Sequence, residues 1–547
     1  MACCRSSGRR LYLGLAALAI MVCTLSVLAL IGQIVTATDP DSLDLGTLIL
    51  FIVSAAGLIG GHAYGQRATA AIVEGELDRI RRRLVSAVRR IEYDRFEAVG
   101  RTRIYDSVTR NSAVISEAAL MTYSGVTAIG SLVFSGLYTL YLSPLVFASM
   151  LGVMIAGSFF LRLTQRGIRQ AMVRAGSVET GFLRLFAHLL DGFKEVRLHQ
   201  ARGDDLETAF LVDGSAAMRT ARVDAARRIN QGIVTTLSLF YVNVVVIAFL
   251  LPPFLGDMDV VAKAVYVAVF LLSAVDMVSR TLPMVQRAGM ALGMLDGVLA
   301  DLQRAGVEVP HPTPAEGPAA AEGGAAAGFS RLELEDIVFS YRDDQGGRIF
   351  GLGPLSLSLD RGEVLFVVGG NGSGKSTFMK VLTRLYRPEA GTIRVDGAEV
   401  KEANAGAYRA LFSAVFADFH LFDRLYGLAL RSPEEVSALL AQLGIGDKVG
   451  YVDGRFTTTE LSTGQRKRLA FAVALLEDRP ILVLDEVAAD QDPEFRQSFY
   501  RDWLPRLKAE GRTLVVVSHD ERYEDAADRI VRLRDGRIAE RTGPGAR

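Results

Sequence analysis

Long apolar runs fill the first half of the chain, whereas short apolar runs alternate with polar segments in the second half. Leu11–Ile31 contains no charged residue, and about twenty apolar residues suffice for a helix to cross a bilayer. This run is longer than a signal-peptide core of about 7–15 residues, so we interpret it as a membrane helix. The pattern predicts six spanning helices: Leu11–Ile31, Leu45–Tyr64, Ala118–Leu142, Leu145–Leu161, Ile233–Phe254 and Val260–Val278.

Helical periodicity continues beyond these spans. Apolar residues recur at steps of three and four after the second span: Leu77, Ile80, Leu84, Val88 and Ile91. Such spacing places them on one face of a helix. We expect helices two to five to extend far into the cytosol and to turn near Gly100–Thr109 and Leu190–His199. Independent cytosolic hairpins over 66–117 and 162–232 are the alternative.

Charge placement orients the predicted helices. About eleven arginines lie between the second and third spans, whereas the connections on the other side carry aspartates such as Asp39 and Asp257. Because loops rich in Lys and Arg stay in the cytoplasm, both termini are expected there.

Composition narrows the class of protein. Half of the 547 residues are hydrophobic and the formal net charge is zero, which argues against nucleic-acid binding through a general basic surface. The three cysteines, Cys3, Cys4 and Cys23, form no disulfide framework. The length calls for more than one domain.

A change of pattern separates two domains. Residues 311–328 are rich in Pro, Gly and Ala, as a flexible linker is. Strands then alternate with helices, which indicates an α/β domain with a parallel sheet. Near-continuous apolar runs predict buried strands at Glu363–Val368, Pro480–Leu484 and Thr513–Val517. We expect an all-α membrane domain over 1–305, a linker over 306–330 and the α/β domain over 331–547.

A glycine-rich loop follows the first of these strands. It fits the pattern G-x-x-x-x-G-K-[ST], in which backbone N–H groups and a helix N-terminus cradle phosphates. Lys375 is expected to reach the β- and γ-phosphates, and the Ser376 hydroxyl is expected to bind Mg²⁺. ATP and Mg²⁺ are therefore the predicted ligands. The expected nucleotide-binding residues of this segment are Gly369, Asn371, Gly372, Ser373, Gly374, Lys375, Ser376 and Thr377.

Polar residues follow the other two strands. Ligands of parallel sheets bind at the carboxyl ends of the strands, so these residues are expected at the edge that carries the phosphate loop. Asp485 is positioned to hold Mg²⁺ through water, and Glu486 to act as general base. His519 is expected to contact the γ-phosphate or position the attacking water. The alternatives are solvated carboxylates and a structural histidine.

The candidates for a substrate cavity in the predicted spans are polar residues: Asp276, Tyr241, Asn243, Tyr123, Tyr138 and Tyr141. An ionisable residue in a membrane helix usually faces a cavity. A local pair between Asp276 and Arg280, at i and i+4, is an equally good explanation. Helix packing and interfacial placement explain the tyrosines and Asn243 as well.

The second half resembles the ABC ATPases. The segment Leu461–Gln465, about twenty residues before Asp485, is similar to their signature LSGGQ and has Thr463 in place of the middle glycine. The resemblance implies that Tyr341 stacks on adenine and that Asp492 ends the D-loop. With six spans, the chain looks like an exporter-type ABC half-transporter. The signature residues are Leu461, Ser462, Thr463, Gly464 and Gln465.

Finer features resemble one branch of that family. The segments YRALFSAVFADFHLF, LSTGQRKRL and DEVAADQDP are similar to the cyclic-peptide exporters, found with peptide siderophores, lipopeptides and microcins. Most ABC proteins have a glutamine where Ala417 stands, and that glutamine links the Mg²⁺ site to the membrane domain. Asp418 or His420 is a candidate substitute, and other contacts are the alternative.

The resemblance implies a mechanism. Two copies of the chain would form a homodimer in a bacterial inner membrane, with ATP on one copy capped by Ser462 and Gly464 of the other. Both ATPase domains and all termini would be cytoplasmic. The expected function is ATP-driven export of a cyclic or nonribosomal peptide by alternating access. Alternatives are a multidrug or lipid exporter, a siderophore importer, and a regulatory ATPase that moves no cargo.

Overall fold

The computed structural model describes residues 19–31, 33–34, 45–305, 329–342, 347–428 and 431–543. The expected linker, apart from its last residues, and the first eight residues of the first predicted span lie outside this set. The chain divides into two compact units, Met1–Ser86 with Arg101–Asp301, and Ala87–Gly100 with Leu302–Arg547. The short segment Ala87–Gly100 thus belongs with the C-terminal unit.

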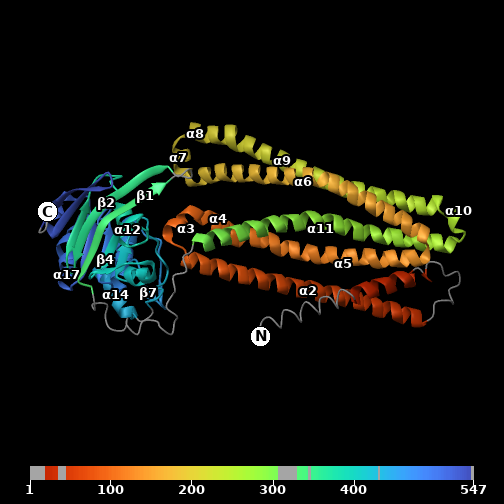
Figure 1. Cartoon of the computed structure of the whole chain (residues 1–547), viewed down its shortest axis with the longest axis horizontal. Coiled ribbons are helices and arrows are strands. Elements are labelled where there is room, and N and C mark those ends of the chain that lie inside the picture. Colours follow the sequence, from red (N-terminus) through yellow and green to blue (C-terminus); the bar gives the residue numbers. More distant parts are fainter. Residues whose placement is uncertain are drawn as a thin grey trace. The chain divides into compact units, whose positions relative to one another are not determined.

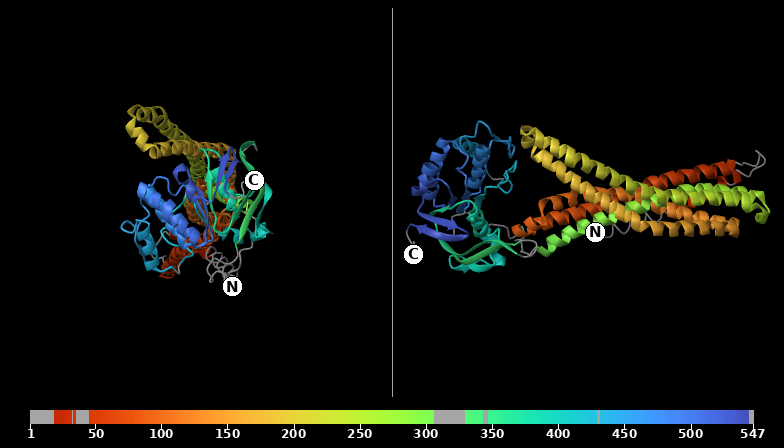
Figure 2. Two further views of the ribbon diagram at one scale, coloured as in Figure 1. Left: turned by 90° about the vertical axis from the view of Figure 1, so that its left-hand side faces the viewer. Right: turned by 90° about the horizontal axis from the view of Figure 1, so that it is seen from above.

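The first unit is a bundle of long helices (Figure 1). Within the described ranges, five helical stretches are long and apolar enough to span a membrane, and a shorter apolar helix covers Ala19–Ile31. The α6–α9 pair crosses the other long helices at an angle (Figure 2). The helices are α2 (Leu45–Arg90), α4 (Arg101–Asp106), η2 (Ser107–Asn111), α5 (Ser112–Leu142), α6 (Pro144–Asp191), α7 (Phe193–Leu198), α8 (Gln200–Asp205), η3 (Leu206–Val212), α9 (Asp213–Val245), η4 (Val246–Leu250), α10 (Pro252–Leu255) and α11 (Met258–Ala305).

The long helices continue well beyond the predicted spans. Helix α2 has 46 residues and is therefore about 69 Å long, more than twice the thickness of the bilayer core. Ser143 caps α6 by accepting a hydrogen bond from the Val146 N–H, and Pro144 begins that helix. The second predicted turn is confirmed at Gly192 and His199, on either side of α7.

The first predicted turn, Gly100–Thr109, is wrong over most of its length. The chain leaves α2 at Ile91–Glu92, forms α3 (Tyr93–Val99), and breaks again at Gly100, whose φ of 83° favours glycine. Residues 101–111 are helical. The break before α3 contains neither glycine nor proline, so no sequence signal marks it.

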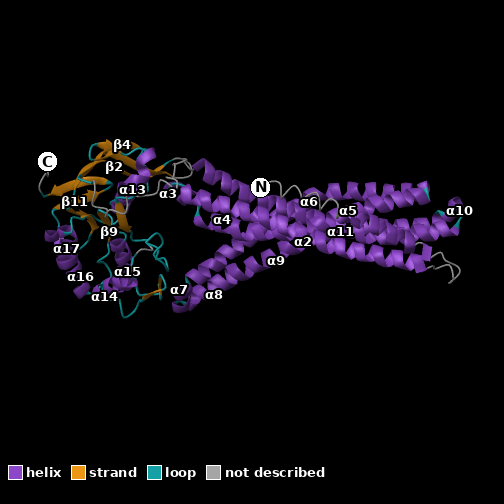
Figure 3. Cartoon of the chain, turned by 90° about the horizontal axis from the view of Figure 1, so that it is seen from below, coloured by secondary structure: helices purple, strands orange, loops and turns teal. Residues whose placement is uncertain are grey.

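The second unit combines two main sheets and a short hairpin (Figure 3). A four-stranded antiparallel sheet has the order β2-β1-β4-β5, and a six-stranded sheet has the order β12-β11-β3-β10-β9-β6. Neighbours in the larger sheet are parallel except β11 and β12. The strands are β1 (Arg331–Arg342), β2 (Arg348–Asp360), β3 (Val364–Val368), β4 (Ala390–Val395), β5 (Ala398–Glu399), β6 (Phe412–Val415), β7 (Tyr451–Val452), β8 (Arg455–Phe456), β9 (Ile481–Asp485), β10 (Thr513–Val517), β11 (Arg529–Arg534) and β12 (Arg537–Thr542).

Helices cover both faces of the larger sheet, which explains its apolar strands. Phe366 packs into one hydrophobic core and its neighbour Val367 into the other. All five residues of β3, β9 and β10 are buried, as the three apolar runs predicted. The helices of this unit are α3, α12 (Lys375–Leu382), η5 (Glu402–Asn404), α13 (Ala405–Arg409), α14 (Pro433–Gln442), α15 (Thr463–Leu476), α16 (Pro493–Ser498), η6 (Phe499–Trp503), α17 (Leu504–Ala509) and η7 (Glu521–Ala526).

Candidate functional site

The glycine-rich loop connects β3 to α12, the context that a phosphate loop requires. Gly374 has a φ of 102°, and a Cβ atom on Gly369 would lie 2.4 Å from the carbonyl oxygen of Leu533. Both positions therefore need glycine. The Nζ atom of Lys375 donates to the carbonyl oxygens of Gly369 and Gly370, at 2.9 and 3.0 Å. The lysine side chain thus closes the loop by bonding to its first two residues.

The Lys375 ammonium lies among neutral acceptors and near two carboxylates. It is buried, and burial lowers its pKa, while the nearby carboxylates of Glu486 and Asp485 oppose that shift. A buried ammonium held by two neutral carbonyl groups gains strongly from a negatively charged partner. Lys375, Glu486 and Asp485 therefore form one electrostatic group at the edge of the sheet.

Asp485 ends β9 and is almost fully buried. Burial raises the pKa of its carboxyl group to about 6, and repulsion from Glu486 adds to the shift. The backbone N–H of Ala417 donates to its Oδ2 atom at 3.3 Å and partly offsets that rise. Because few groups compensate for the burial of its negative charge, this carboxylate is suited to binding a cation.

Glu486 and His519 form a pair at the ends of β9 and β10. The Nε2 atom of His519 lies 2.9 Å from Oε1 of Glu486, and because a carboxylate only accepts, this nitrogen carries the hydrogen. Glu486 has a φ of 52°, a left-handed conformation that a glutamate adopts only under constraint. The backbone N–H of Glu486 donates to Val517, which fixes the residue against β10.

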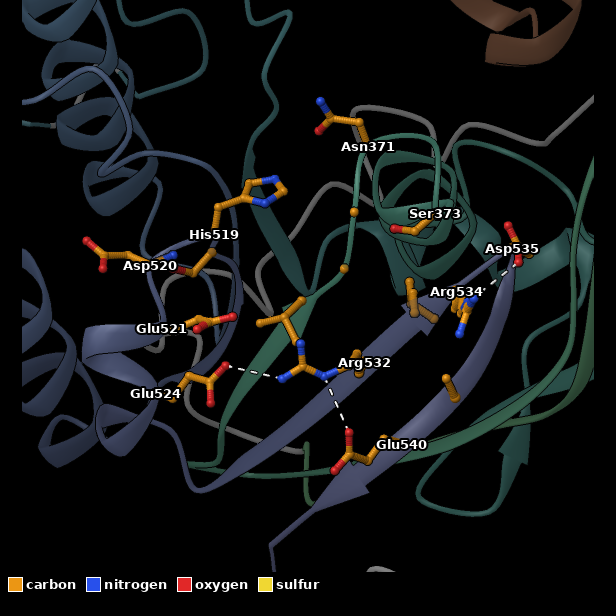
Figure 4. A pocket seen from close by; sticks show the side chains of 16 residues that line it. Asn371, Ser373, His519, Asp520, Glu521, Glu524, Arg532, Arg534, Asp535 and Glu540 are labelled. Atoms are coloured by element: carbon orange, nitrogen blue, oxygen red, sulfur yellow. Dashed lines mark hydrogen bonds and ion pairs between the residues drawn. The ribbon is translucent and has the colours of Figure 1, made fainter.

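Two cavities are lined by members of this pair. One, of about 650 Å³, is lined by Asn371 and Ser373 of the phosphate loop and by His519, with Arg532 between Glu524 and Glu540 (Figure 4). The other, of about 370 Å³, is lined by both Glu486 and His519. A water molecule entering the second cavity reaches the carboxylate and the imidazole together.

The signature segment forms the start of α15. Ser462 accepts a hydrogen bond from the N–H of Gln465, and the Gln465 side chain accepts one from the N–H of Ser462, a reciprocal cap. A Cβ atom on Gly464 would lie 2.9 Å from the carbonyl oxygen of Asp490, so glycine is needed for close approach. Leu461 and Thr463 flank Ser462. The signature thus packs on the D-loop of its own chain.

Two basic residues of α15 were missed by sequence reasoning as parts of the site. Lys467, which is buried, donates to the carbonyl oxygens of Glu486 and Ala489 and pairs with Asp490. Arg468 binds Gln491 and Asp492. They hold the segment after β9 in place. No local signal marks them, because the groups that they contact lie in the segment after β9.

The structure gathers most of the predicted residues at one edge. The ends of β3, β10 and β9, adjacent parallel strands, bring together the phosphate loop, His519, Asp485 and Glu486. The carboxylate of Asp492 caps α16 by accepting from Phe495. Tyr341 lies on β1 and contacts Tyr386, which follows α12.

The candidate cavity residues of the membrane unit are not gathered. Asp276 pairs with Arg280, whose Nε atom lies 2.9 Å from each carboxylate oxygen. On α9, Tyr241 is exposed and Asn243 is buried. A cavity of about 530 Å³ between α2, α5 and α11 is lined by the candidate Tyr123, but its lining does not include Asp276, Tyr241 or Asn243.

The chain is similar in sequence to known ATP-binding transport proteins. The family model described as "ABC transporter" matches residues 352–489. The chain is 36% identical over 416 residues to "ATP-binding protein SyrD" of Pseudomonas syringae pv. syringae, covering 73% of this chain and 71% of that protein. It is also 36% identical over 241 residues to "Macrolide export ATP-binding/permease protein MacB 1/2" of Paracoccus denitrificans, covering 41% of this chain and 35% of that protein.

A solved structure shares the fold. A bacterial Atm1-family ABC exporter with ATP bound has a TM-score of 0.75 at 19% identity, over 98% of this chain and 95% of the other. The apolar helices make the chain a membrane protein. Its phosphate loop, signature and strand-end acids, together with these similarities, show that the chain belongs to the ABC transporter family, as an exporter half-transporter that couples ATP hydrolysis to transport.

Proposed function

We propose that two copies of the chain form a homodimer in a bacterial inner membrane that exports a cyclic or nonribosomal peptide by alternating access. The observation that carries this proposal is the extent of similarity to SyrD, which spans 73% of the chain, whereas the MacB relative aligns over 41%. The segments LSTGQRKRL and DEVAADQDP, which resemble the cyclic-peptide exporters, support the same substrate class.

In this proposal Glu486 is the general base of hydrolysis. Its carboxylate lines the smaller cavity, together with His519 and the segment after β9, and its one ion-pair partner among the described residues is His519. A carboxylate in such a position accepts a proton from water as the water attacks the γ-phosphate. His519 donates its Nε2–H to the carboxylate and also lines the larger cavity, as do Asn371 and Ser373 of the phosphate loop.

The donor set fits Mg²⁺. Among the described residues, no group of three or more His, Cys, Asp or Glu side chains is placed to hold a metal alone. Mg²⁺ is normally held by one or two protein oxygens together with phosphate oxygens and water. Ser376 and the buried carboxylate of Asp485 supply such oxygens. We propose that they hold Mg²⁺ when ATP is bound, and that the ion neutralises charge on the phosphates.

Acid is expected to weaken Mg²⁺-dependent ATP binding, because a proton and the metal compete for Asp485. With a pKa of about 6, this carboxylate is mostly ionised at pH 7 and mostly protonated at pH 5. We expect the affinity for a fluorescent ATP analogue with Mg²⁺ to fall about tenfold over this range. Without ligands the sign reverses: since folding raises this pKa, the contribution of Asp485 to stability falls as pH rises from about 4 to about 6.

Asp485→Asn separates this effect from protonation of ATP itself. The variant cannot titrate at position 485, so its affinity should be low at pH 7 and change less than about threefold down to pH 5. An equal pH dependence of the two proteins would assign the effect to the nucleotide and contradict the role of Asp485.

Dimerisation is proposed because the described tertiary contacts of the signature glycine are with the segment after β9, through Gln491 and Asp490. Ser462 uses an oxygen lone pair for its cap, which leaves its hydroxyl hydrogen free to donate. Together with the N-terminus of α15, a helix of 14 residues, that donor suits the γ-phosphate bound by a second copy.

Transport assays in proteoliposomes test the substrate class. The chain would be reconstituted, and ATP hydrolysis and vesicle uptake would be measured with a cyclic lipopeptide, a peptide siderophore and a macrolide. We expect a cyclic or nonribosomal peptide to raise hydrolysis at least twofold and to enter inside-out vesicles, with Glu486→Gln as the inactive control. Stimulation by the macrolide alone would favour a multidrug exporter, and uptake only into right-side-out vesicles would favour an importer.

A further inference from the structure

Lys467 is a buried lysine whose ammonium group is fully hydrogen-bonded. It stands in the second turn of α15, and its side chain is 9% exposed. The Nζ atom donates to the carbonyl oxygens of Glu486 and Ala489, at 3.1 and 3.3 Å, and to Oδ2 of Asp490 at 3.0 Å. Since an ammonium group has three hydrogens to donate, all of them are used. These three acceptors offset the free energy that burial of the charge costs.

The three acceptors belong to one turn of the main chain, directly after β9. The N–H of Ala489 donates to the carbonyl oxygen of Glu486 at 3.1 Å and closes this turn. Glu486 and Asp490 both have left-handed backbone conformations, with φ of 52° and 59°. Residues other than glycine keep such conformations only where surrounding contacts hold them. Lys467 contacts both of these residues, so its ammonium is one of the groups that hold the turn.

The main chain of Glu486 is fixed at both of its polar groups. Its N–H donates to the carbonyl oxygen of Val517 on β10, and its carbonyl oxygen accepts from Lys467 of α15. Among the described residues, two side chains hydrogen-bond to Glu486, that of Lys467 and that of His519, which donates to the carboxylate. The Glu486 side chain leaves from the atom between its N–H and its carbonyl group. Its direction therefore depends on the contact with Lys467.

Other contacts join α15 to the same segment without involving Glu486. The Nε2 atom of Gln491, which is buried, donates to the carbonyl oxygen of Gly464 at 2.9 Å. The Nε atom of Arg468 donates to Oε1 of Gln491, also at 2.9 Å. These bonds remain when Lys467 is replaced. Loss of the Lys467 ammonium is therefore expected to loosen Glu486 without detaching the segment from the helix.

We propose that Lys467 is a positioning residue for ATP hydrolysis, which acts through the carbonyl group of Glu486 and holds the carboxylate where it can take a proton from the attacking water. This inference rests on the proposed function, in which Glu486 is the general base. A base must lie within hydrogen-bond reach of the water, and a misplacement of about 1 Å can lower a rate about 100-fold. The described hydrogen bonds of Lys467 all go to the segment after β9 and none to the phosphate loop, so the hydrolysis step depends on it and ATP binding does not.

ATP hydrolysis by the full-length protein in nanodiscs tests the proposal. Lys467→Met keeps an unbranched apolar side chain and removes the ammonium group. We expect kcat to fall at least about tenfold, whereas KM for ATP and the affinity for AMP-PNP stay within about threefold of native. Lys448→Met is the control, since it removes an exposed lysine beside Asp447, and it should change kcat and KM less than about twofold.

A double-mutant cycle with Glu486→Gln separates positioning of the base from a general structural role. If Lys467 acts through the base, Lys467→Met should lower the residual rate of Glu486→Gln less than about twofold, because no base is left to misplace. Single-turnover hydrolysis of radiolabelled ATP measures these slow rates. An equal loss of kcat in both backgrounds, or a loss that appears as a raised KM, would overturn the proposal.

Folding of each variant is checked by its melting temperature and its affinity for AMP-PNP. If Lys467→Met melts below the assay temperature, Lys467→Ser takes its place in the same cycle, because it leaves room for water to solvate the freed carbonyl groups. A folded variant with a kcat within about threefold of native would contradict the proposal. If Glu486→Gln alone kept most of the native rate, the proposed general base would be wrong, and the inference about Lys467 with it.

Discussion

Replacing Glu486 by glutamine is expected to lower the rate of ATP hydrolysis at least a hundredfold and to leave ATP bound. Glutamine has nearly the same shape, and its amide oxygen still accepts the hydrogen bond from Nε2 of His519. The amide cannot accept the proton of the attacking water, and a positioned base contributes about 10²–10⁴-fold. Because the geometry is kept, the loss measures proton transfer. The measurement is steady-state ATPase activity beside the affinity for an ATP analogue.

Glu510→Gln is the matched control. This glutamate belongs to the same unit but pairs with Arg506 on the surface, so both hydrolysis and binding should stay within about twofold of native. If Glu486→Gln kept more than a fifth of the native rate, another group would have to be the base.

Lys375→Ala is expected to weaken ATP binding about a hundredfold, which corresponds to about 2.8 kcal/mol at 1.4 kcal/mol per tenfold. The buried ammonium now bonds to Gly369 and Gly370, and it would exchange these neutral acceptors for phosphate oxygens. Alanine removes the charge and leaves two loop carbonyl groups without this donor. Titration with a fluorescent ATP analogue measures the loss.

Stability must be followed in the same variant, since the lysine also closes the loop. We expect the melting temperature without nucleotide to change little and the shift produced by ATP to disappear. Lys448→Ala, in which an exposed lysine beside Asp447 is removed, should bind ATP like the native chain. An affinity within fivefold of native for Lys375→Ala would contradict the assignment of the phosphate loop.

Sequence reasoning predicted well the parts of the fold whose environment, a buried sheet or lipid, requires an apolar composition. A strand buried on both faces must be apolar, so β3, β9 and β10 were predicted within a residue or two. Their parallel order then placed the strand-end acids together. The membrane spans were visible because lipid requires long apolar helices, and the stripe from Leu77 to Ile91 ends one residue beyond the last residue of α2, Arg90.

Other parts depend on contacts between distant segments, which no local pattern contains. The turn before α3 has no glycine or proline, although Glu92 adopts an extended backbone conformation there. The role of Lys467 is set by three acceptors that come from the segment after β9. The partner of Tyr386 lies 289 positions away in the chain. The candidate cavity residue Asp276 could not be decided from sequence, because its local pair with Arg280 uses the spacing of an ordinary helix.

The backbone amide of Ala417 donates a hydrogen bond to the carboxylate of Asp485, and this affects how natural variation at position 417 should be interpreted. A main-chain donor is supplied by every amino acid except proline. Exchange among alanine, serine or glutamine at this place therefore preserves the hydrogen bond to Asp485, whereas proline abolishes it and leaves a buried carboxylate with one donor fewer. A sequence motif lists only side chains and therefore does not show this hydrogen bond. The backbone N–H group keeps the hydrogen bond when the side chain at position 417 changes.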